Sequence, residues 1–394
     1  MADVYYDPYD ADIVLDPYPV FARLRDEAPL YYNEAYDFWA VSRYADVEKG
    51  LVDARRFISG RGGILELIKA NIEMPPGTLI FEDPPAHDIH RSLLSRVFTP
   101  RRVAALEPKI REFCAQALDP LVGSGGFDFI ADLGAQMPMR VIGMLFGIPE
   151  ADLVTVREGT DANLRTEAGK PMEIPEGTTF GSEMYADYID WRIDHPSDDL
   201  MTELLTTEFE DEHGVTRTLT RDEALMYTTV VTGAGNETTT RLIGWAGKVL
   251  AEHPDQRREL VEDRSLIPNA IDELLRYEPT GPAVGRYVPE DVEVLGEKVP
   301  AGSAMLMLVG AANRDERKFD DPDRFDIHRK IGQHLTFGYG IHYCLGAALA
   351  RLEGRIALDE VLDRFPEWEV DLSTAKLSPT STVRGWETLP ATVP

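Results

Sequence analysis

The chain has 394 residues, of which 43% are hydrophobic and 28% charged, a composition typical of a globular protein that buries a large core. A formal charge of -29 argues against nucleic acid or an anionic membrane as the main partner. Two cysteines, Cys114 and Cys344, exclude a disulfide framework and suit a reducing cytoplasm. We find no run of 18 apolar residues, so we expect no membrane anchor. The amino terminus lacks the basic segment and the apolar core of a signal peptide, so we expect no signal peptide either.

The first ninety residues predict a short helix and two short strands. Residues 20–27 form the expected helix, and residues 30–32 and 38–42 the expected strands. Residues 87–279 then read as almost wholly helical, with Pro/Gly clusters as loops between the helices. We find no internal repeat and no low-complexity linker.

Strand patterns resume after Pro279. Residues 292–302 predict a hairpin, and residues 303–311 (SAMLMLVGA) a buried strand. A final helix follows Cys344 and stops at Pro366. Because strands from both ends could share one sheet, we expect a single interwoven domain over residues 1–394, mainly α with a minor β portion.

The longest predicted helix spans residues 221–253, roughly 50 Å at 1.5 Å per residue. Thr220 and Glu223 form a capping box at its start, and Pro254 closes its end. Its middle, VVTGAGNETTT at residues 230–240, places glycines and polar groups where buried apolar residues are expected, at a cost of about 1 kcal/mol per glycine. Either the helix is kinked with its threonines bonded to their own carbonyls, or it is opened so that a ligand can lie against it.

The stretch FGYGIHYCLG, residues 337–346, surrounds Cys344 with glycines. The cysteine would open a helix, where backbone N–H groups and the helix dipole stabilise a thiolate. Gly338, Gly340 and Gly346 permit a tight turn and the close approach of something flat and bulky. A buried free cysteine needs no such setting, so the spacing F-G-x-G-x-H-x-C-x-G favours a ligand-binding thiolate.

Three other kinds of site fit the sequence less well. A structural zinc site needs four ligands, and no further Cys or His pair has the required spacing. No oriented base can be assigned to Cys344 as a catalytic nucleophile. The run at residues 233–238 lacks the third glycine of a dinucleotide loop and lies inside a helix. One soft thiolate beside open space fits ligation of haem iron best.

The cysteine stretch resembles the ligand signature of the cytochrome P450 haem-thiolate monooxygenases of the soluble bacterial kind, and the resemblance covers essentially the whole chain. It implies a triangular single-domain fold with haem between a long central helix and the helix of the cysteine loop, and Cys344 as the iron ligand. Glu273 and Arg276 match the E-x-x-R pair that this family buries near the haem. AGNETT (234–239) matches the acid–threonine segment of its distal helix, and residues 311–326 resemble the meander before its cysteine loop.

The resemblance also implies the cofactor, haem b (iron protoporphyrin IX), and the residues that hold it. DPPAHDIHR (83–91) resembles the helix whose His87 and Arg91 contact the haem propionates. Arg286 and His342 fall where the family places further propionate partners. The implied cofactor-binding residues are therefore Cys344, His87, Arg91, Arg286, His342, Phe337, Gly338 and Gly346.

Glu237 and Thr238 are the implied catalytic residues, because in this family an acid and a threonine deliver protons for O–O cleavage. Adjacent on one helix, they could hold a water chain. Their presence favours an oxygen-using monooxygenase over a peroxide-driven relative or a haem isomerase. A haem-binding sensor or lipid carrier without turnover is the alternative from another class.

Electrons must come from another protein, since the chain has no flavin, iron–sulfur or nicotinamide motif. The resemblance implies a ferredoxin and an NAD(P)H–ferredoxin reductase, and we expect a cytoplasmic monomer. An acidic ferredoxin would need a local basic patch on this acidic chain. The candidates are Arg101, Arg102, Lys109, Arg111, Arg351 and Arg355.

The substrate is expected to be lipophilic, such as a terpenoid, steroid, fatty acyl or aromatic compound. Residues 61–81, largely apolar, should form a mobile loop over the pocket. No obvious cation could clamp a substrate carboxylate, although Arg61 and Lys69 could serve. The expected pocket lining comprises Val231, Ala234, Pro282, Ala283, Val284 and Val383.

Overall fold

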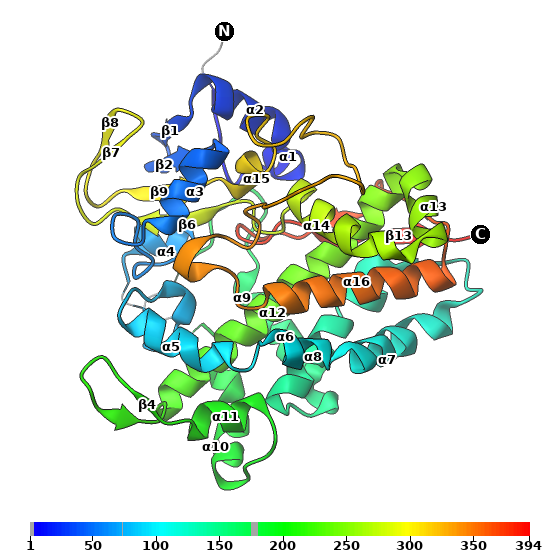
Figure 1. Cartoon of the computed structure of the whole chain (residues 1–394), viewed down its shortest axis with the longest axis horizontal. Helices are drawn as coiled ribbons and strands as arrows, with labels where there is room; N and C mark the ends of the chain where they lie inside the picture. The colour runs from blue at the N-terminus through cyan, green and yellow to red at the C-terminus, as the bar shows by residue number, and fades with distance from the viewer. Residues whose placement is uncertain (1–3, 73, 175–179) are drawn as a thin grey trace.

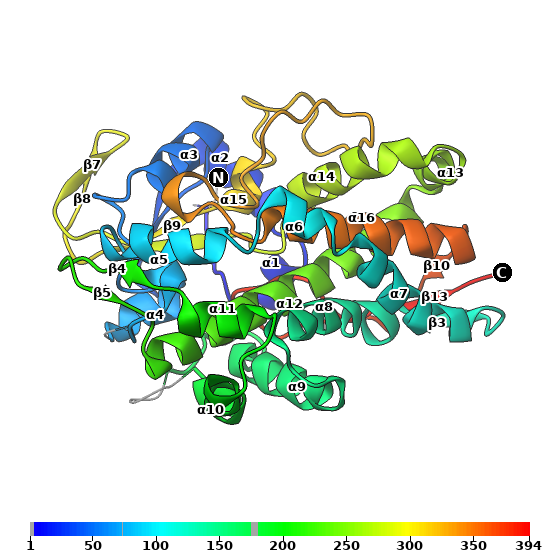
Figure 2. The ribbon, with the colours of Figure 1, turned by 60° about the horizontal axis from the view of Figure 1, so that its bottom comes forward.

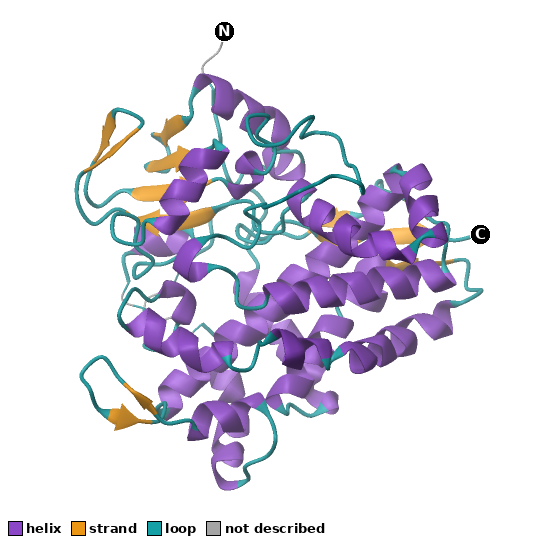
Figure 3. Ribbon diagram, viewed as in Figure 1, coloured by secondary structure: helices purple, strands orange, loops and turns teal. Residues whose placement is uncertain are grey.

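The computed structural model describes residues 4–72, 74–174 and 180–394, and it combines many helices with a small share of strands (Figures 1 and 3). The helices are α1 (Ala11–Leu15), α2 (Tyr18–Glu27), α3 (Tyr44–Val52), α4 (Leu65–Ala70), α5 (Ala86–Ser95), α6 (Pro100–Ala104), α7 (Glu107–Leu118), α8 (Met137–Phe146), α9 (Leu153–Leu164), α10 (Ala186–Asp194), α11 (Leu200–Thr206), α12 (Arg221–Glu252), α13 (Pro254–Glu262), α14 (Ile267–Tyr277), α15 (Val309–Ala312) and α16 (Ala347–Arg364). The strands are β1 (Leu30–Asn33), β2 (Phe38–Val41), β3 (Gly126–Asp128), β4 (Phe209–Glu210), β5 (Thr216–Arg217), β6 (Val284–Tyr287), β7 (Val292–Val294), β8 (Glu297–Val299), β9 (Ala304–Met307), β10 (Glu369–Val370), β11 (Lys376–Leu377), β12 (Trp386–Thr388) and β13 (Pro390–Thr392). The predicted fold class, mainly α with a minor β portion, is confirmed.

A four-stranded sheet of order β1-β2-β9-β6 joins segments from the two ends of the sequence. β2 pairs in parallel with β9, and β9 pairs antiparallel with β6. The predicted strand at residues 303–311 is present only as β9, which is buried along its whole length, while residues 309–311 belong to α15. The expected hairpin at residues 292–302 is also present, as the antiparallel pair β7–β8. Strands from both ends therefore share a sheet, while the assignment of residues 1–394 to one domain stays a prediction.

The helix α12 crosses the middle of the molecule, with α16 and α8 packed against it (Figure 2). Its predicted capping box is present: Thr220 N donates to Glu223 Oε2 at 2.7 Å, and Glu223 N donates to Thr220 Oγ1 at 3.2 Å. The unusual middle segment stays helical. Its threonine hydroxyls donate to carbonyls one turn earlier, from Thr238 to Ala234 at 2.7 Å and from Thr240 to Asn236 at 3.0 Å. The structure therefore favours back-bonded threonines over an opened helix.

The stretch Phe129–Phe146 is long and apolar enough to cross a membrane, but 61% of it is buried inside the molecule. It includes α8, which packs against α12 in the main apolar core. Its apolar character is thus explained by packing against the central helix.

A fully buried ion pair fixes the segment that leads to the cysteine loop. Glu273 and Arg276, both in α14, have fully buried side chains and are joined by two hydrogen bonds of 2.7 and 2.8 Å. Arg276 Nη1 also donates to the carbonyls of Asn313 at 2.9 Å and Pro322 at 2.8 Å. Glu273 Oε1 accepts from Arg329 Nε at 2.9 Å. The predicted E-x-x-R pair thus anchors the irregular segment of residues 313–329 to α14.

Candidate active site

The cysteine loop makes two tight turns before α16 begins. Gly338 and Gly340 have φ of +69° and +75°, in the left-handed region that glycine adopts most readily. Cys344 N donates to Phe337 O at 2.8 Å, which closes the loop. The helix starts only at Ala347, so the prediction that Cys344 itself opens the helix is wrong. The reason is local, because the Cys344 N–H closes the loop. The chain takes up the direction of the helix axis only over the residues that follow.

Part of the Cys344 side chain is accessible to solvent, while many protein atoms lie close to its sulfur. Burial raises the pKa of this thiol, while the Gly346 N–H and the charges of Arg91 and Arg351 act in the opposite direction. A Cβ at Gly346 would meet no atom within 4 Å, so space is open beside the cysteine. Phe337 packs under Arg351, with the guanidinium 4.5 Å from the ring centroid. The loop thus holds a thiol and donors to its thiolate next to open space.

Two histidine rings meet beside this loop. His87 in α5 and His342 in the loop have ring centroids 4.3 Å apart. His87 is fully buried, with Nδ1 3.0 Å from Asp88 Oδ1. The Nε2 atoms of both rings are buried and find no hydrogen-bond partner among the described residues. Burial lowers the pKa of His342 to about 3, helped by Arg286, His87 and Arg91, so this ring is neutral at pH 7.

Two arginines complete the cluster. Arg91 donates to the carbonyl of Tyr343, and burial lowers its pKa. Arg286 is 4% exposed, donates to Gly285 O at 2.8 Å, and has its pKa lowered by burial to about 10. Within the described ranges neither arginine forms an ion pair, and both lie close enough to His342 to depress its pKa. Two arginines that form no ion pair and two unpaired imidazole nitrogens fit the two propionates of haem.

The structure separates the two expected catalytic residues. Glu237 is buried and forms an ion pair with Arg241, one turn further along α12. Arg241 also donates to Ser378 Oγ at 2.9 Å and so ties the pair to the C-terminal segment. Thr238, half-buried, donates instead to Ala234 O, and Ala234 is exposed although it lies in the central helix. Adjacent helical residues project about 100° apart, so Glu237 and Thr238 face different neighbours.

Sequence reasoning missed Asp161, a second carboxyl group beside Glu237. Asn236 Nδ2 donates to Asp161 Oδ1 at 3.4 Å. Burial raises the pKa of Asp161 to about 6, and the Glu237 charge acts in the same direction, against Arg157 and Arg241. Asp161 lies on α9, 76 residues before Glu237, and no local sequence pattern signals this contact. Asp161 and Glu237 can therefore share one proton where α9 contacts α12.

The expected pocket residues do not form one group. Val231 packs half-buried against the main core, whereas Pro282 and Ala283 line a separate hollow near the N-terminal segment. Val284 and Val383 are half-buried. Residues 61–81 contain α4 and a single turn at Leu79–Phe81, with residue 73 outside the described residues. Of the two suggested clamps, Lys69 is paired with Asp37 at 2.5 Å and Arg61 is exposed.

We predict that Asp161→Asn stabilises the protein increasingly as the pH rises above about 4, with the full effect above about pH 6. The folded carboxyl, with its pKa raised from 3.8 to about 6, holds its proton more tightly than the unfolded one. Its stabilising contribution is present at low pH and is lost as the pH rises from about 4 through 6. Asn resembles the protonated acid, so the variant should match wild type near pH 3 and exceed it by about 1–2 kcal/mol at pH 8, after allowance for solvent screening. Unfolding measured across this range, with exposed Asp198→Asn as control, checks the sign; a pH-independent difference contradicts it.

Comparisons with known proteins show the family of the chain. Residues 186–390 match the family model described as Cytochrome P450. Cytochrome P450 123 of Mycobacterium tuberculosis is 39% identical over 99% of this chain and 97% of its own length. The cytochrome P450 monooxygenase PikC of Streptomyces venezuelae is 35% identical over 96% and 91%. A solved structure of a mutant of P450 EryK in complex with erythromycin B superposes with a TM-score of 0.87 and 32% identity, covering 97% of each chain. The chain belongs to the cytochrome P450 family of haem-thiolate monooxygenases.

Proposed function

We propose that this chain binds haem b and, with two electrons from NAD(P)H through a ferredoxin system, inserts one oxygen atom into a lipophilic small molecule. The cluster of His87, Arg91, Arg286 and His342 carries the proposal, because neither arginine forms an ion pair among the described residues and the Nε2 atoms of both histidines are buried without a partner there. These four groups would hold the propionates, and Cys344 the iron. When bound, the haem would supply the oxygen activation, since a thiolate ligand favours O–O cleavage.

We predict that Cys344→Ser abolishes the thiolate-type absorption spectrum of the reduced, carbon monoxide-treated protein. Serine keeps the size of the side chain but replaces the soft sulfur that a haem-thiolate spectrum requires. The control is Cys114→Ala, since Cys114 is the other cysteine and is buried in the main core. That variant should keep the spectrum. A thiolate spectrum that survives in Cys344→Ser would assign the iron to a different residue.

Thr238 is the better placed of the two expected proton-handling residues. Its hydroxyl lies one turn from exposed Ala234, whereas Glu237 is bound to Arg241. We infer that Thr238 orients water at the open side of α12, and that Glu237 and Asp161 share a proton behind it. Proton transfer by a positioned side chain contributes typically about 10²–10⁴-fold to rate.

Thr238→Ala should therefore uncouple the reaction. We expect the variant to bind haem and substrate, to consume NAD(P)H, and to release more peroxide with about a hundredfold less product per NAD(P)H, the low end of such effects. The substrate would first be found by titrating terpenoids, steroids, fatty acids and aromatics while the haem Soret band is recorded. Thr238→Ser keeps a hydroxyl and should restore most of the coupling. Equal coupling in wild type and Thr238→Ala would exclude the proposed role.

The ferredoxin docking patch needs revision, because four of its six expected members are ion-paired. Arg102 pairs with Glu203, Lys109 with Glu112, Arg351 with Asp272, and Arg111 with three acids. Arg101 and Arg355 have no such partner in the described part of the chain, and the same holds for exposed Arg96. α6, which carries Arg101, packs against α16, the helix that follows the cysteine loop. We propose that a ferredoxin binds at these unpaired arginines.

Arg101→Glu should slow reduction by ferredoxin several-fold at low salt, because it replaces an attractive charge with a repulsive one. Substrate binding, followed at the Soret band, should not change. The matched control is Arg258→Glu, an exposed arginine on α13 that lacks an acidic partner among the described residues. Equal slowing by both variants would indicate a general effect of charge and contradict this docking site.

The lipophilic character of the substrate is supported by the apolar side chains of residues 61–81. The related P450 EryK structure holds erythromycin B, a bulky organic molecule. We place the enzyme in the cytoplasm as a monomer, consistent with two free cysteines among the described residues.

A further inference from the structure

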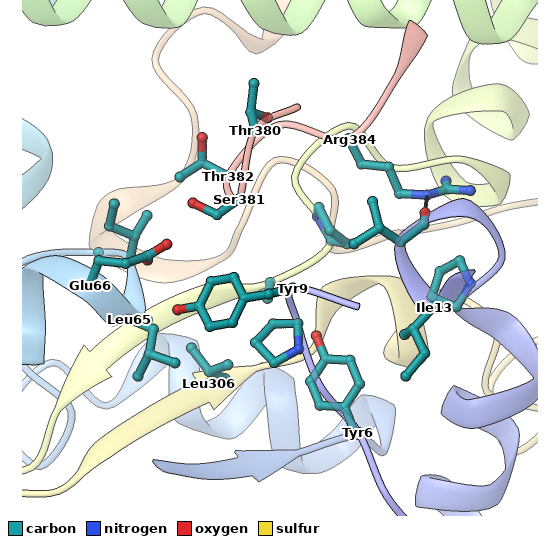
Figure 4. A pocket seen from close by; sticks show the side chains of 18 of the residues that line it. Tyr6, Tyr9, Ile13, Leu65, Glu66, Leu306, Thr380, Ser381, Thr382 and Arg384 are labelled. Carbon is teal, nitrogen blue, oxygen red and sulfur yellow. Dashed lines mark hydrogen bonds between the residues drawn. The ribbon is translucent and has the colours of Figure 1, made fainter. Parts of the chain in front are cut away.

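A hollow opens where the N-terminal segment, α4 and the loop of residues 380–382 meet (Figure 4). It contains about 700 Å³ of space between atoms, part of it continuous with solvent. Two further hollows, of about 580 and 490 Å³, adjoin it, and Tyr9 lines all three. As a cavity the hollow measures only about 70 Å³ and its neighbours about 270 and 110 Å³, so a ligand of ordinary size would extend from one into the next.

The hollow lies on one face of β6, and the cluster assigned to the propionates lies on the other. Ala283 and Gly285 line the hollow, whereas Arg286 faces His342. This alternation follows from the strand, in which successive residues point to opposite sides. The hollow and the Arg286–His342 cluster thus lie on opposite faces of one strand.

Glu66 places an uncompensated negative charge in the wall of this hollow. Its side chain is 8% exposed, and its carboxylate accepts from Met172 N at 3.2 Å and from the Tyr9 hydroxyl. The nearest lining cations are already neutralised, Lys69 by Asp37 and Arg384 by Glu278. A buried carboxylate that has hydrogen bonds but no counter-ion attracts a cation.

Two hydroxyl groups in the same wall are unused. Ser381 Oγ and Thr382 Oγ1 are buried and have no hydrogen-bond partner within the described residues. Figure 4 shows the Glu66 carboxylate and the hydroxyls of Tyr9 and Ser381 at the same end of the hollow. Leaving buried hydroxyls unpaired costs about 1–3 kcal/mol each, a cost that a polar ligand group removes.

The apolar part of the lining comprises Ile13, Val14, Pro17, Phe21, Pro282 and Leu306. A ligand that fits the whole lining has an apolar body and a positively charged head. A carboxylate head would instead meet Glu66 and find no free cation in the described wall.

We propose that this hollow is a second ligand site, which binds a lipophilic ammonium compound with its cationic head at Glu66 and its apolar body against the N-terminal segment. The site goes beyond the proposed oxygen insertion and requires no haem chemistry. It selects ligands by charge: amines bind, and acids of the same shape do not.

The test compares two probes that share one apolar cage, N,N,N-trimethyl-1-adamantanammonium and 1-adamantanecarboxylate. Calorimetric titration of the haem-loaded protein should detect the ammonium probe, and the carboxylate at least about tenfold more weakly. The quaternary nitrogen has no lone pair for iron, so the Soret band should stay unchanged. Glu66→Gln keeps an acceptor for Met172 N but removes the charge, and it should weaken ammonium binding about tenfold.

Two further variants separate the site from general effects. Glu34→Gln removes an exposed acid elsewhere and should leave binding unchanged, which excludes attraction by the overall charge of -29. Val14→Trp fills the space at the apolar part of the lining from a half-exposed position and should abolish binding of both probes. Thermal unfolding confirms that each variant is folded. Ammonium binding that is absent in wild type, unaffected by Glu66→Gln, or accompanied by a Soret shift overturns the proposal, and none of these outcomes bears on the monooxygenase reaction.

Discussion

The ion pair between Glu273 and Arg276 is the interaction on which the cysteine site depends. Both side chains are fully buried, so the pair is stable only because every charge is also hydrogen-bonded. The guanidinium fixes the carbonyl of Asn313, and Asn313 Oδ1 in turn accepts from Leu335 N at 2.8 Å. Leu335 lies two residues before the cysteine loop begins. Removing one partner would leave a buried charge unpaired, at about 3–5 kcal/mol, and would release the segment that positions the thiolate.

Charge balance explains why the haem-binding cluster stands out. The chain has 69 acidic and 40 basic residues, so most arginines find an acid nearby, as Arg111 finds three. Arg91 and Arg286 are exceptions among the described residues, although both lose hydration on burial. Such an arrangement is unfavourable for the protein alone and favourable once an anionic ligand binds. Asp88 contacts His87 and Asp83 acts on Arg286, but neither arginine has an ion pair in the described part of this acidic chain. The two unpaired arginines are therefore the strongest structural support for the propionate assignment.

Features that depend on neighbouring residues could be predicted from the sequence, and features that depend on packing could not. The capping box at Thr220 and the turns of the cysteine loop follow from local spacing, because three or four residues determine them. The pairing of Glu237 with Arg241 could also be predicted from the sequence, because it is an i,i+4 contact on one helix. The contact of Asp161 with this pair could not be predicted, because it arises where α9 crosses α12. Ion pairing of the basic patch is mixed: Lys109–Glu112 and Arg111–Glu107 are local contacts within α7. The pairs of Arg102 with Glu203 and of Arg351 with Asp272 join helices that meet only in the folded chain.

The strand β6 connects the two ligand environments through one glycine. A Cβ at Gly285 would lie 2.9 Å from Ile68 Cδ1 and 3.0 Å from the backbone of Gly63, closer than real side chains come. Gly285 N also donates to Gly63 O at 2.7 Å. The missing side chain therefore lets α4 pack directly on β6, which brings Glu66 to the hollow. The next residue, Arg286, faces the opposite side and the haem-binding cluster. Gly285 thus lets Glu66 reach the site proposed for a cationic ligand, and Arg286 points to the site proposed for the anionic propionates. The strand lies between these two opposite charges.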